Sequence, residues 1–340
     1  MEKIGILTGG GDCPGLNAVI RGIVRAAQGE WQILGFKHGW KGPIENDYIL
    51  LDQTSVSGIL PRGGTILGTS RTNPYKVDNG VERLKKTLAE HNLKALVAIG
   101  GEDTLGVANK LSQEGVKVVG VPKTIDNDLN ATDYTFGYDT ALNIAMECID
   151  RLHTTAESHN RVIVVEIMGR HAGWITLEAG IAGGADVILI PEVPIDINKV
   201  CDLIRKRHQR GKSFSIVAVS EGAQLKGSDV TLDHKKDSFG HVRLGGIGQH
   251  IAELIEEKTG YESRVTVLGH IQRGGSPSAF DRILGTRFGV KAVELIRKGK
   301  FGRMASLQGR NIVDVALAEA VGQLKTVPKE YYEMAEVFFG

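Results

Sequence analysis

Two short acidic segments, separated in the chain by one predicted helix, carry the side chains best suited to chemistry. The first is Gly100-Gly101-Glu102-Asp103-Thr104, and the second is Pro122-Lys123-Thr124-Ile125-Asp126-Asn127-Asp128. Each follows a short apolar run, residues 95–99 and 116–121, that predicts a buried parallel strand. Because the carboxyl ends of parallel strands meet at one edge of a sheet, we expect both loops to border the same ligand crevice.

The crevice would gather several carboxylates around one lysine, Lys123; the acids are Glu102, Asp103, Asp126, Asp128 and Asp133. Such a cluster is costly unless a cation offsets it. Mg²⁺ prefers one or two carboxylates together with phosphate oxygens, which Glu102 and a neighbouring acid offer. An aspartate in the second segment is suited to accept a hydroxyl proton during phosphoryl transfer. The alternative for residues 126–128 is a turn closed by Asx hydrogen bonds.

Two glycine-rich segments, residues 8–17 and 61–71, are candidates for binding phosphate. The first lies between a predicted strand and a helix, where glycine N–H groups and the helix N-terminus favour an anion. It lacks the Gly-Lys-Ser/Thr ending of a Walker A loop, and a tight strand–helix turn is the other interpretation. The second ends in Arg71, which either pairs with phosphate oxygens or is a solvated surface arginine.

Basic residues in the second half of the chain suit a substrate that carries a phosphate at one end. They lie within a few residues of predicted strand ends: Arg161, Arg170, Arg264 and Arg273. His270 precedes Arg273 by three residues, although a histidine alone is more often structural. Glu221 follows the predicted strand 215–219, where it either accepts hydrogen bonds from sugar hydroxyls or caps a turn.

The elements that must position these residues alternate between strand and helix, which predicts an α/β protein with parallel sheets. The predicted strands are 4–7, 95–99, 117–121, 162–167, 187–190, 215–219 and 264–268. The predicted helices are 16–27, 104–113, 140–155, 172–182, 197–209, 246–258 and 278–298. The strands fall into two sets, before and after residue 138, which predicts two sheets. Residues 224–243 are polar and are expected to form a surface loop or hairpin.

Composition limits the class of protein further. The chain has 340 residues, 41% of them apolar and 24% charged, so two domains of ordinary size are expected. Its net charge of +1 indicates neither nucleic acid nor an acidic membrane surface as a partner. No stretch approaches the roughly 20 apolar residues of a membrane helix. The cysteines, Cys13, Cys148 and Cys201, lack metal-ligand spacing and suit a reducing cytosol. A cytoplasmic enzyme is expected.

Over almost its whole length the sequence resembles the 6-phosphofructokinases. The matching segments, in the family's order, are residues 9–17, 62–71, 100–104, 124–128, 168–174 (Met-Gly-Arg-His-Ala-Gly-Trp) and 268–275 (Leu-Gly-His-Ile-Gln-Arg-Gly-Gly). The resemblance implies two Rossmann-like three-layer domains with mostly parallel sheets and an active site in the cleft between them. Residues 1–137 with 272–322 would form the phosphoryl-donor domain. Residues 138–271 with 323–340 would form the fructose 6-phosphate domain.

The resemblance also assigns roles to residues. Asp126 would accept the proton of the sugar 1-hydroxyl, and Glu102 would be the acid associated with Mg²⁺. Residues implied in catalysis or donor binding are Lys123, Asp103, Arg170, Gly10, Gly11, Arg71 and Thr104. Residues implied on the fructose 6-phosphate side are Thr124, Asp126, Asp128, Met168, Gly169, Arg170, Glu221, His270 and Arg273. Arg161 and Arg264 match arginines that reach a neighbouring subunit, which implies a homodimer or homotetramer.

Two positions bear on the phosphoryl donor, which is ATP in one part of the family and pyrophosphate in the other. ATP-dependent members usually have glycine where this chain has Asp103. A carboxylate 4 Å from a nucleotide's α-phosphate is repelled by ~1 kcal/mol per charge in water and ~4 kcal/mol at an effective dielectric near 20. Lys123 can neutralise the transferring group, although a branch of ATP users also has lysine there. We expect a pyrophosphate-dependent, reversible enzyme serving glycolysis and gluconeogenesis, with an ATP-dependent 6-phosphofructokinase as the alternative.

Three other classes fit less well. NAD and lipid kinases also use a glycine-rich acidic segment after a strand, Gly-Gly-Asp-Gly-Thr, where this chain has Gly-Gly-Glu-Asp-Thr, but they do not need segments such as residues 168–174 and 268–275. A regulatory paralogue without turnover is expected to lose Glu102 or Asp126, and both are present. A Rossmann dehydrogenase requires a Gly-x-Gly-x-x-Gly turn after the first strand and an acidic residue at the end of the next strand. The chain lacks this combination.

Overall fold

The computed structural model describes residues 2–227 and 246–340, and its chain divides into two compact units. Unit 1 comprises Met1–Ile125, Leu129–Thr140 and Arg273–Leu324, and unit 2 comprises Asp126–Asp128, Ala141–Gln272 and Lys325–Gly340. Residues 126–128 group with unit 2, whereas the sequence analysis assigned them to the donor domain. Most of the loop expected at 224–243 lies outside the described residues.

Unit 1 contains a seven-stranded sheet in the order β11-β10-β5-β4-β1-β2-β3. Its strands are β1 (Lys3–Thr8), β2 (Gln32–Phe36), β3 (Tyr48–Leu51), β4 (Leu93–Gly100), β5 (Val118–Pro122), β10 (Arg303–Gln308) and β11 (Asn311–Ala316). The central strands pair in parallel, and the edge strands β3 and β11 pair antiparallel. The loops after β1, β4 and β5 therefore leave the sheet at one edge.

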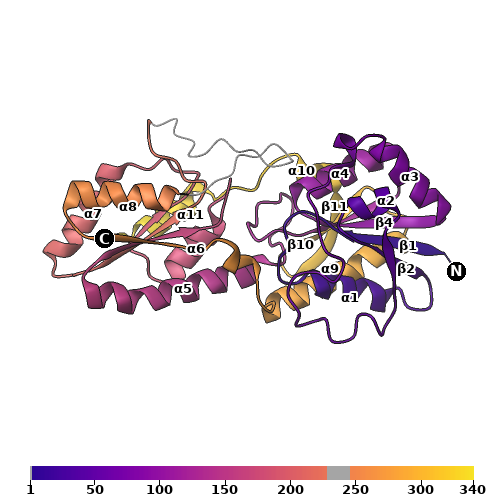
Figure 1. The fold of residues 1–340 in the computed structure, drawn as a ribbon, viewed down its shortest axis with the longest axis horizontal. Coiled ribbons are helices and arrows are strands. Elements are labelled where there is room, and N and C mark those ends of the chain that lie inside the picture. Colours follow the sequence, from indigo (N-terminus) through magenta and orange to yellow (C-terminus); the bar gives the residue numbers. More distant parts are fainter. Residues whose placement is uncertain (1, 228–245) are drawn as a thin grey trace. The chain divides into compact units, whose positions relative to one another are not determined.

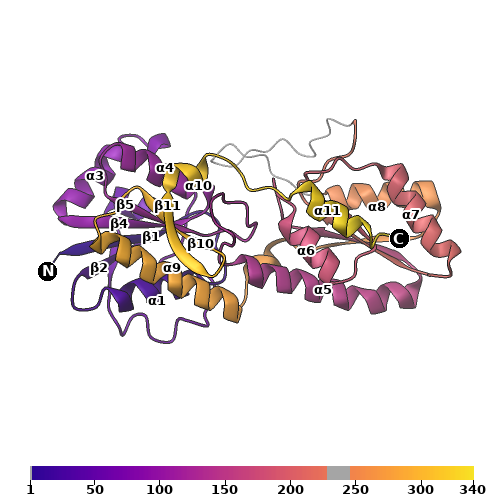
Figure 2. The ribbon, with the colours of Figure 1, turned by 180° about the vertical axis from the view of Figure 1, so that it is seen from behind.

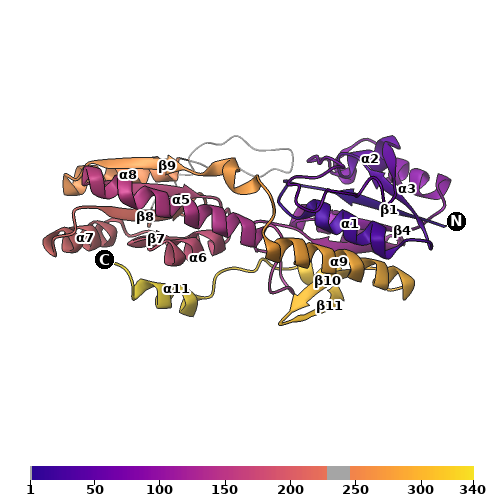
Figure 3. The same cartoon turned by 90° about the horizontal axis from the view of Figure 1, so that it is seen from below.

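Helices cover both faces of this sheet (Figure 1). One face carries α1 (Leu16–Ala26) and α9 (Ala279–Arg297); the other carries α2 (Lys41–Glu45), α3 (Gly80–Glu90), α4 (Glu102–Gln113) and α10 (Leu317–Val321). A single 3₁₀ turn, η1 (Pro74–Lys76), precedes α3. Figure 3 shows α1 and α9 side by side. They pack closely because Gly289 has no side chain: a Cβ there would lie 2.5 Å from the carbonyl oxygen of Val19.

Unit 2 contains a four-stranded parallel sheet in the order β7-β8-β6-β9. Its elements are β6 (Val162–Ile167), β7 (Val187–Leu189), β8 (Ser215–Ser220), β9 (Ser263–Val267), α5 (Tyr138–His159, which starts in unit 1), α6 (Trp174–Ala182), α7 (Ile197–Gln209), α8 (Ile247–Thr259), η2 (Gly269–Arg273) and α11 (Lys329–Glu336). Alternate strand residues such as Val162 and Val164 pack with buried residues of α7 and α8. Figure 1 shows α7 and α8 on one side of this sheet and α5 on the other, and Figure 2 shows α11 beside α6.

All the predicted strands and helices are present, β6 and α7 with the predicted ends and the others with shifted ends, and the prediction of an α/β fold with two mostly parallel sheets is confirmed. The sequence analysis missed the short edge strands β3 and β11, their neighbours β2 and β10, and the helices α2, α3, α10 and α11. Several of these elements carry weak apolar patterns, although β2 is buried from Ile33 to Phe36. For example, α3 buries only Gly80, Leu84 and Thr87, so most of its sequence is polar.

Candidate active site

The glycine-rich turn after β1 packs against the start of α4 within unit 1. The N–H of Gly9 donates to the carbonyl of Ile99 at 2.9 Å, and a Cβ on Gly9 would lie 2.6 Å from Oγ1 of Thr104. Gly10 has a φ of +78° and a Cβ there would lie 3.5 Å from Nζ of Lys123. Glycine is therefore required at position 9 by close approach and favoured at position 10 by its backbone conformation.

The second glycine-rich segment is tied to the first. The hydroxyl of Thr69 donates a hydrogen bond to the carbonyl of Gly10. The backbone N–H of Gly10 donates in turn to the carbonyl of Ser70 at 3.4 Å. Arg71 follows Ser70 and is exposed. The two candidate phosphate segments therefore form one surface of unit 1, with an arginine at its margin.

Asn17, fully buried at the start of α1, joins the two glycine-rich segments by hydrogen bonds. Its Nδ2 donates to the carbonyl of Arg62 at 2.9 Å, and its Oδ1 accepts from the N–H of Ile66 at 2.9 Å. The sequence analysis quoted Asn17 only as part of a motif. Its position one residue into a helix was the available signal, because a polar side chain there faces the preceding loop.

Lys123 at the end of β5 supplies a positive charge to this surface. Its side chain is 4% exposed, and its Nζ donates to the carbonyl of Gly11. Its backbone N–H donates to the carbonyl of Gly100 at 2.9 Å, which fixes the lysine to the strand that precedes α4. Gly10, Thr104 and Lys123, assigned to donor binding and catalysis from sequence, are thus brought together.

Glu102 and Asp103 form the first turn of α4, and both are exposed. Acids at a helix N-terminus are stabilised by the free N–H groups and by the helix dipole. Within the residues that the structure describes, no three side chains of His, Cys, Asp or Glu converge as a complete metal cage. The donor set of Glu102 with Asp103 fits Mg²⁺ in its common mode, with one or two carboxylates and the remaining ligands from phosphate and water.

Arg273 lies in unit 1, although the sequence analysis grouped it with the sugar-phosphate residues. Its Nη1 donates to the carbonyl of Asp12 at 3.3 Å, and a Cβ on Gly11 would lie 2.1 Å from that nitrogen. A Cβ on Gly63 would likewise lie 2.1 Å from the carbonyl oxygen of Gly275. The loop after η2 therefore packs onto both glycine-rich segments and brings a second cation beside the turn.

Cys13 lies beneath the same turn and is fully buried. Its Sγ lies 3.7 Å from the carbonyl oxygen of Phe136. Burial raises the pKa of this thiol to about 12, so it stays neutral at physiological pH. The thiolate is the reactive form of cysteine, and Cys13 therefore has a packing role rather than a nucleophilic one.

In unit 2, the predicted sugar-phosphate residues Met168, Gly169, Arg170 and Glu221 come together at the carboxyl ends of β6 and β8. The N–H of Glu221 donates to the carbonyl of Ile167 at 2.8 Å. Gly169 has a φ of +144°, and a Cβ there would lie 2.5 Å from Oγ of Ser220, which donates to the carbonyl of Gly169. The parallel pairing of β6 with β8 and the contact between Gly169 and Ser220 place the loops after these two strands side by side.

His270 belongs to the same edge of the unit 2 sheet. It lies in η2, directly after β9, and its side chain is exposed. β9 pairs in parallel with β6, and the N–H of Leu268 donates to the carbonyl of Glu166 at 2.9 Å. His270 therefore follows the same sheet edge as Arg170.

Arg161 and Arg264 lie at the opposite end of this sheet. Arg161 precedes β6, and Arg264 is the second residue of β9. Both guanidinium groups bind the carboxylate of Glu262, Arg161 at 2.9 Å, and the hydrogen bond from Arg161 lowers the pKa of that carboxyl. The six residues of β6 span about 20 Å at roughly 3.3 Å per residue, so these arginines are not brought together with Arg170 in their own unit.

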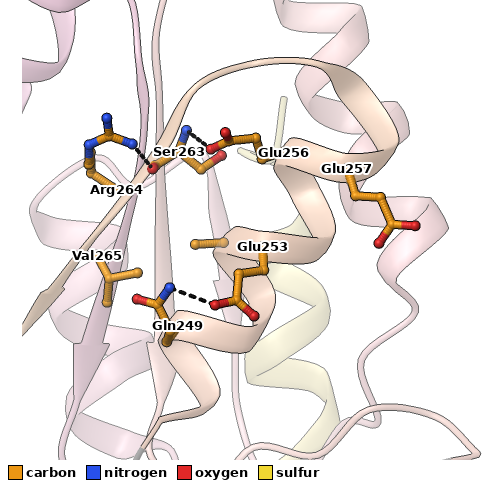
Figure 4. Close-up of a pocket in the computed structure, with 8 residues that line it drawn as sticks. Gln249, Glu253, Glu256, Glu257, Ser263, Arg264 and Val265 are labelled. Carbon is orange, nitrogen blue, oxygen red and sulfur yellow. Dashed lines mark hydrogen bonds between the residues drawn. The ribbon is translucent and has the colours of Figure 1, made fainter.

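Arg264 also lines a pocket of about 360 Å³ between α8 and β9 (Figure 4). The other charged residues of the lining are Glu253, Glu256 and Glu257. Figure 4 shows Glu256 accepting from the N–H of Ser263 and Glu253 accepting from Gln249. Three carboxylates repel a phosphate, so this pocket is not a site for a phosphorylated substrate.

The loop Asp126-Asn127-Asp128 makes a contact that the sequence analysis did not predict, between Asn127 and Lys325. Asn127 has a φ of +52° and is 3% exposed. Its Oδ1 accepts from Nζ of Lys325 at 3.0 Å. Nothing near residue 325 in the sequence signals this contact, because the partners are far apart in the chain.

Two other predicted residues flank this loop. The carbonyl of Thr124 accepts from the hydroxyl of Thr135 at 2.7 Å within unit 1. Asp133, expected among the clustered acids, accepts from the N–H of Gly309 at 2.6 Å in the turn between β10 and β11. That hydrogen bond gives Asp133 a structural role in the hairpin.

Comparison with known proteins identifies one family. The model of the family described as Phosphofructokinase matches residues 3–296. The pyrophosphate–fructose 6-phosphate 1-phosphotransferase of Amycolatopsis methanolica is 59% identical over 342 aligned residues, covering 99% of this chain and 100% of its own. The ATP-dependent 6-phosphofructokinase of Corynebacterium efficiens is 51% identical, covering 99% of each.

A solved structure, phosphofructokinase from Pichia pastoris in the T-state, superposes with a TM-score of 0.84 at 30% identity. The match covers 99% of this chain and 36% of that one. No helix among the residues described here is both long enough and apolar enough to cross a membrane.

Proposed function

The chain belongs to the phosphofructokinase family, and from that premise we propose that its phosphoryl donor is pyrophosphate. As a phosphotransferase of this family it acts on fructose 6-phosphate. In the proposed reaction the sugar 1-oxygen bonds to one phosphorus of pyrophosphate and the bridging P–O bond breaks. The products are fructose 1,6-bisphosphate and orthophosphate, and the reaction is reversible.

The observation that carries the proposal is Asp103 in the first turn of α4. The next residue, Thr104, contacts Gly9 of the phosphate turn, so the start of α4 borders the place where donor phosphates would bind. A carboxylate there costs about 1–4 kcal/mol against each nearby phosphate charge at 4 Å. Pyrophosphate has no α-phosphate and no nucleoside to pass this residue. The relatives alone favour pyrophosphate only modestly, because enzymes named for each donor match the whole chain.

The remaining roles follow from chemistry. Asp126 accepts the proton of the 1-hydroxyl, and Lys123, beside Gly11, stabilises charge on the transferring group. Arg170, Glu221 and His270 bind the sugar phosphate from one edge of the unit 2 sheet. Bound through Glu102, Mg²⁺ would neutralise charge on the donor phosphates.

The enzyme is also proposed to be a homo-oligomer in which Arg161 and Arg264 serve a neighbouring subunit's site. Both lie at the far end of the sheet from Arg170. β9 is an edge strand, and Val267 at its end and Ile271 in η2 are 58% and 65% exposed, which makes this edge suitable for association. The three free cysteines suit the proposed location in a reducing cytoplasm.

The test measures fructose 1,6-bisphosphate formation from fructose 6-phosphate and Mg²⁺, with pyrophosphate and ATP in parallel. We expect turnover with pyrophosphate alone. Turnover of the native chain with ATP would overturn Asp103 as the feature that excludes nucleotide.

Two substitutions separate the charge of Asp103 from its size. Asp103→Gly should admit ATP, because it removes both the charge and the side chain. Asp103→Asn keeps the size and removes the charge, so it should admit ATP only partly. A folded Asp103→Gly, Lys123→Gly double variant that shows no turnover with ATP would contradict the proposal that Asp103 excludes the nucleotide.

A further inference from the structure

The chain segment that begins at Lys325 returns to unit 2 and binds the loop of the proposed base. The backbone N–H of Lys325 donates to the carbonyl of Asp128 at 2.9 Å. Its Nζ donates to Oδ1 of Asn127 at 3.0 Å. One residue from the C-terminal part of the chain therefore contacts two consecutive residues directly after Asp126.

Lys325 is itself held by the start of α6. Nε1 of Trp174 donates to the carbonyl of Lys325 at 2.9 Å, and the ammonium lies 5.6 Å from the centroid of the indole ring. Trp174 closes the segment that begins with Met168-Gly169-Arg170. The anchor of the loop is thus continuous with the residues proposed to bind the sugar phosphate.

A carboxylate fixes the same segment two residues further on. Oε1 of Glu192 accepts from the N–H of Val327 at 2.9 Å, and both oxygens of Glu192 accept from the N–H of Gly173 at 3.0 and 3.2 Å. Lys325 is therefore bounded by two attachments to the residues around the start of α6. Because the backbone around Lys325 is fixed in this way, its side chain can hold the Asp126-Asn127-Asp128 loop in place.

The loop has a conformation that benefits from such an attachment. Asn127 is in the left-handed region, with a φ of +52°, and its side chain is almost fully buried. Residues other than glycine rarely adopt this conformation, and asparagine adopts it most readily when its amide is hydrogen-bonded. A change in the backbone dihedral angles of Asn127 would rotate the neighbouring peptides and move the carboxylate of Asp126.

We propose that Lys325 is a positioning residue, which fixes the Asp126-Asn127-Asp128 loop through Asn127 and so aims the carboxylate of Asp126. The inference rests on the proposed function, in which Asp126 accepts the proton of the 1-hydroxyl. Displacing a reacting group by about 1 Å can cost on the order of 100-fold in rate. Lys325 acts through the loop and touches neither substrate.

The main variant is Lys325→Met, which keeps most of the stem and removes the donor. Its kcat should fall about 10–100-fold while the KM values change much less, because Arg170, Glu221 and His270 of unit 2 and the phosphate turn of unit 1 keep their places. Lys325→Arg keeps the charge and the donors and should recover most of the loss. Lys329→Met, at an 81% exposed lysine in the same C-terminal segment, is the matched control and should behave as the native chain.

Asn127→Gly separates the hydrogen bond from the charge of Lys325. Glycine tolerates the left-handed conformation, so this variant removes the side chain that accepts from Lys325 and leaves the ammonium in place. If the hydrogen bond matters, kcat should fall as in Lys325→Met, and the double variant should be no slower than either single one. If the two effects multiply, or if Asn127→Gly is fully active, the inference is overturned.

Turnover of every variant is measured with whichever donor supports turnover of the native chain. Thermal unfolding and fructose 6-phosphate binding are measured for every variant as well. A Lys325→Met chain as active as the native one overturns the inference and leaves the proposed function standing. A fall in kcat that is matched by lost sugar-phosphate binding or by unfolding also overturns it. If the native chain is active with ATP alone, the proposed donor fails and the Lys325 comparison is still decided.

Discussion

The phosphate turn of unit 1 and the sugar-phosphate residues of unit 2 are built in different ways. The turn is complete within its own unit, because Lys123, Thr104 and Asn17 are all bound to the two glycine-rich segments. The residues of unit 2 are divided between the two ends of one sheet, with Arg170 at one end and the pair held by Glu262 at the other. Folding of one chain therefore assembles the proposed donor site, whereas the proposed acceptor site would also take Arg161 and Arg264 from a second copy.

The largest effect is expected from removing the base. Asp126→Asn should lower kcat by about 10²–10⁴, the usual contribution of a general base, and should leave both sets of binding residues intact. The measurement is steady-state turnover together with equilibrium binding of fructose 6-phosphate. Lost binding instead of lost turnover would make Asp126 part of the acceptor architecture and would weaken the division between binding and chemistry.

The next effect tests whether the acceptor site is shared between subunits. Arg161→Ala with Arg264→Ala should raise KM for fructose 6-phosphate about 10²–10⁴-fold, since each charge-assisted hydrogen bond contributes about 1.5–3 kcal/mol and the variant removes two arginines. KM for the donor should change little, because the turn of unit 1 is self-contained.

Hybrid oligomers make that test decisive. A differently tagged Asp126→Asn chain, co-expressed with the arginine variant, still carries Arg161 and Arg264. The purified hybrid should turn over at low fructose 6-phosphate, where neither parent is active. A hybrid that keeps the high KM would show that the arginines serve their own chain, and the contrast between the two regions would fail.

The smallest effect on turnover is expected from Asp281, a buried acid of unit 1. Its carboxylate accepts hydrogen bonds from the backbone N–H of Thr140, at 2.8 Å, and from the hydroxyl of Thr140. A side chain at the start of α9 therefore binds the first turn of α5. Burial raises the pKa of Asp281 to about 6, and the nearby Asp139 contributes.

The folded chain therefore holds this proton up to about pH 6, whereas the unfolded chain releases it near 3.8. Stability relative to an Asp281→Asn variant should fall as pH rises from about 4 to about 6 and stay constant above that window. The total change is at most about 3 kcal/mol, because one pKa unit corresponds to about 1.4 kcal/mol. Denaturant unfolding of both proteins between pH 4 and pH 8 measures it, and a difference independent of pH would refute it.

Local pattern was enough to predict the central strands and the helices that pack on them. Runs such as Val162–Ile167 are buried along their whole length, so their apolar character is visible without a partner. Edge elements were missed for the opposite reason: in β11 only Val315 is buried, and the sequence shows little apolar alternation. The loops after β1, β4, β5, β6 and β8 could be assigned chemistry because parallel strands place their carboxyl ends together.

By itself, the sequence determined the family, the α/β class and the residue types of the phosphate turn, because these depend on short segments whose chemistry is local. The tertiary structure decided which of those residues meet. It placed Arg273 beside Gly11, separated Arg161 and Arg264 from Arg170, and brought Lys325 to Asn127. Such contacts join residues far apart in the chain, and their geometry depends on how strands pair and where the chain returns, which no local pattern encodes.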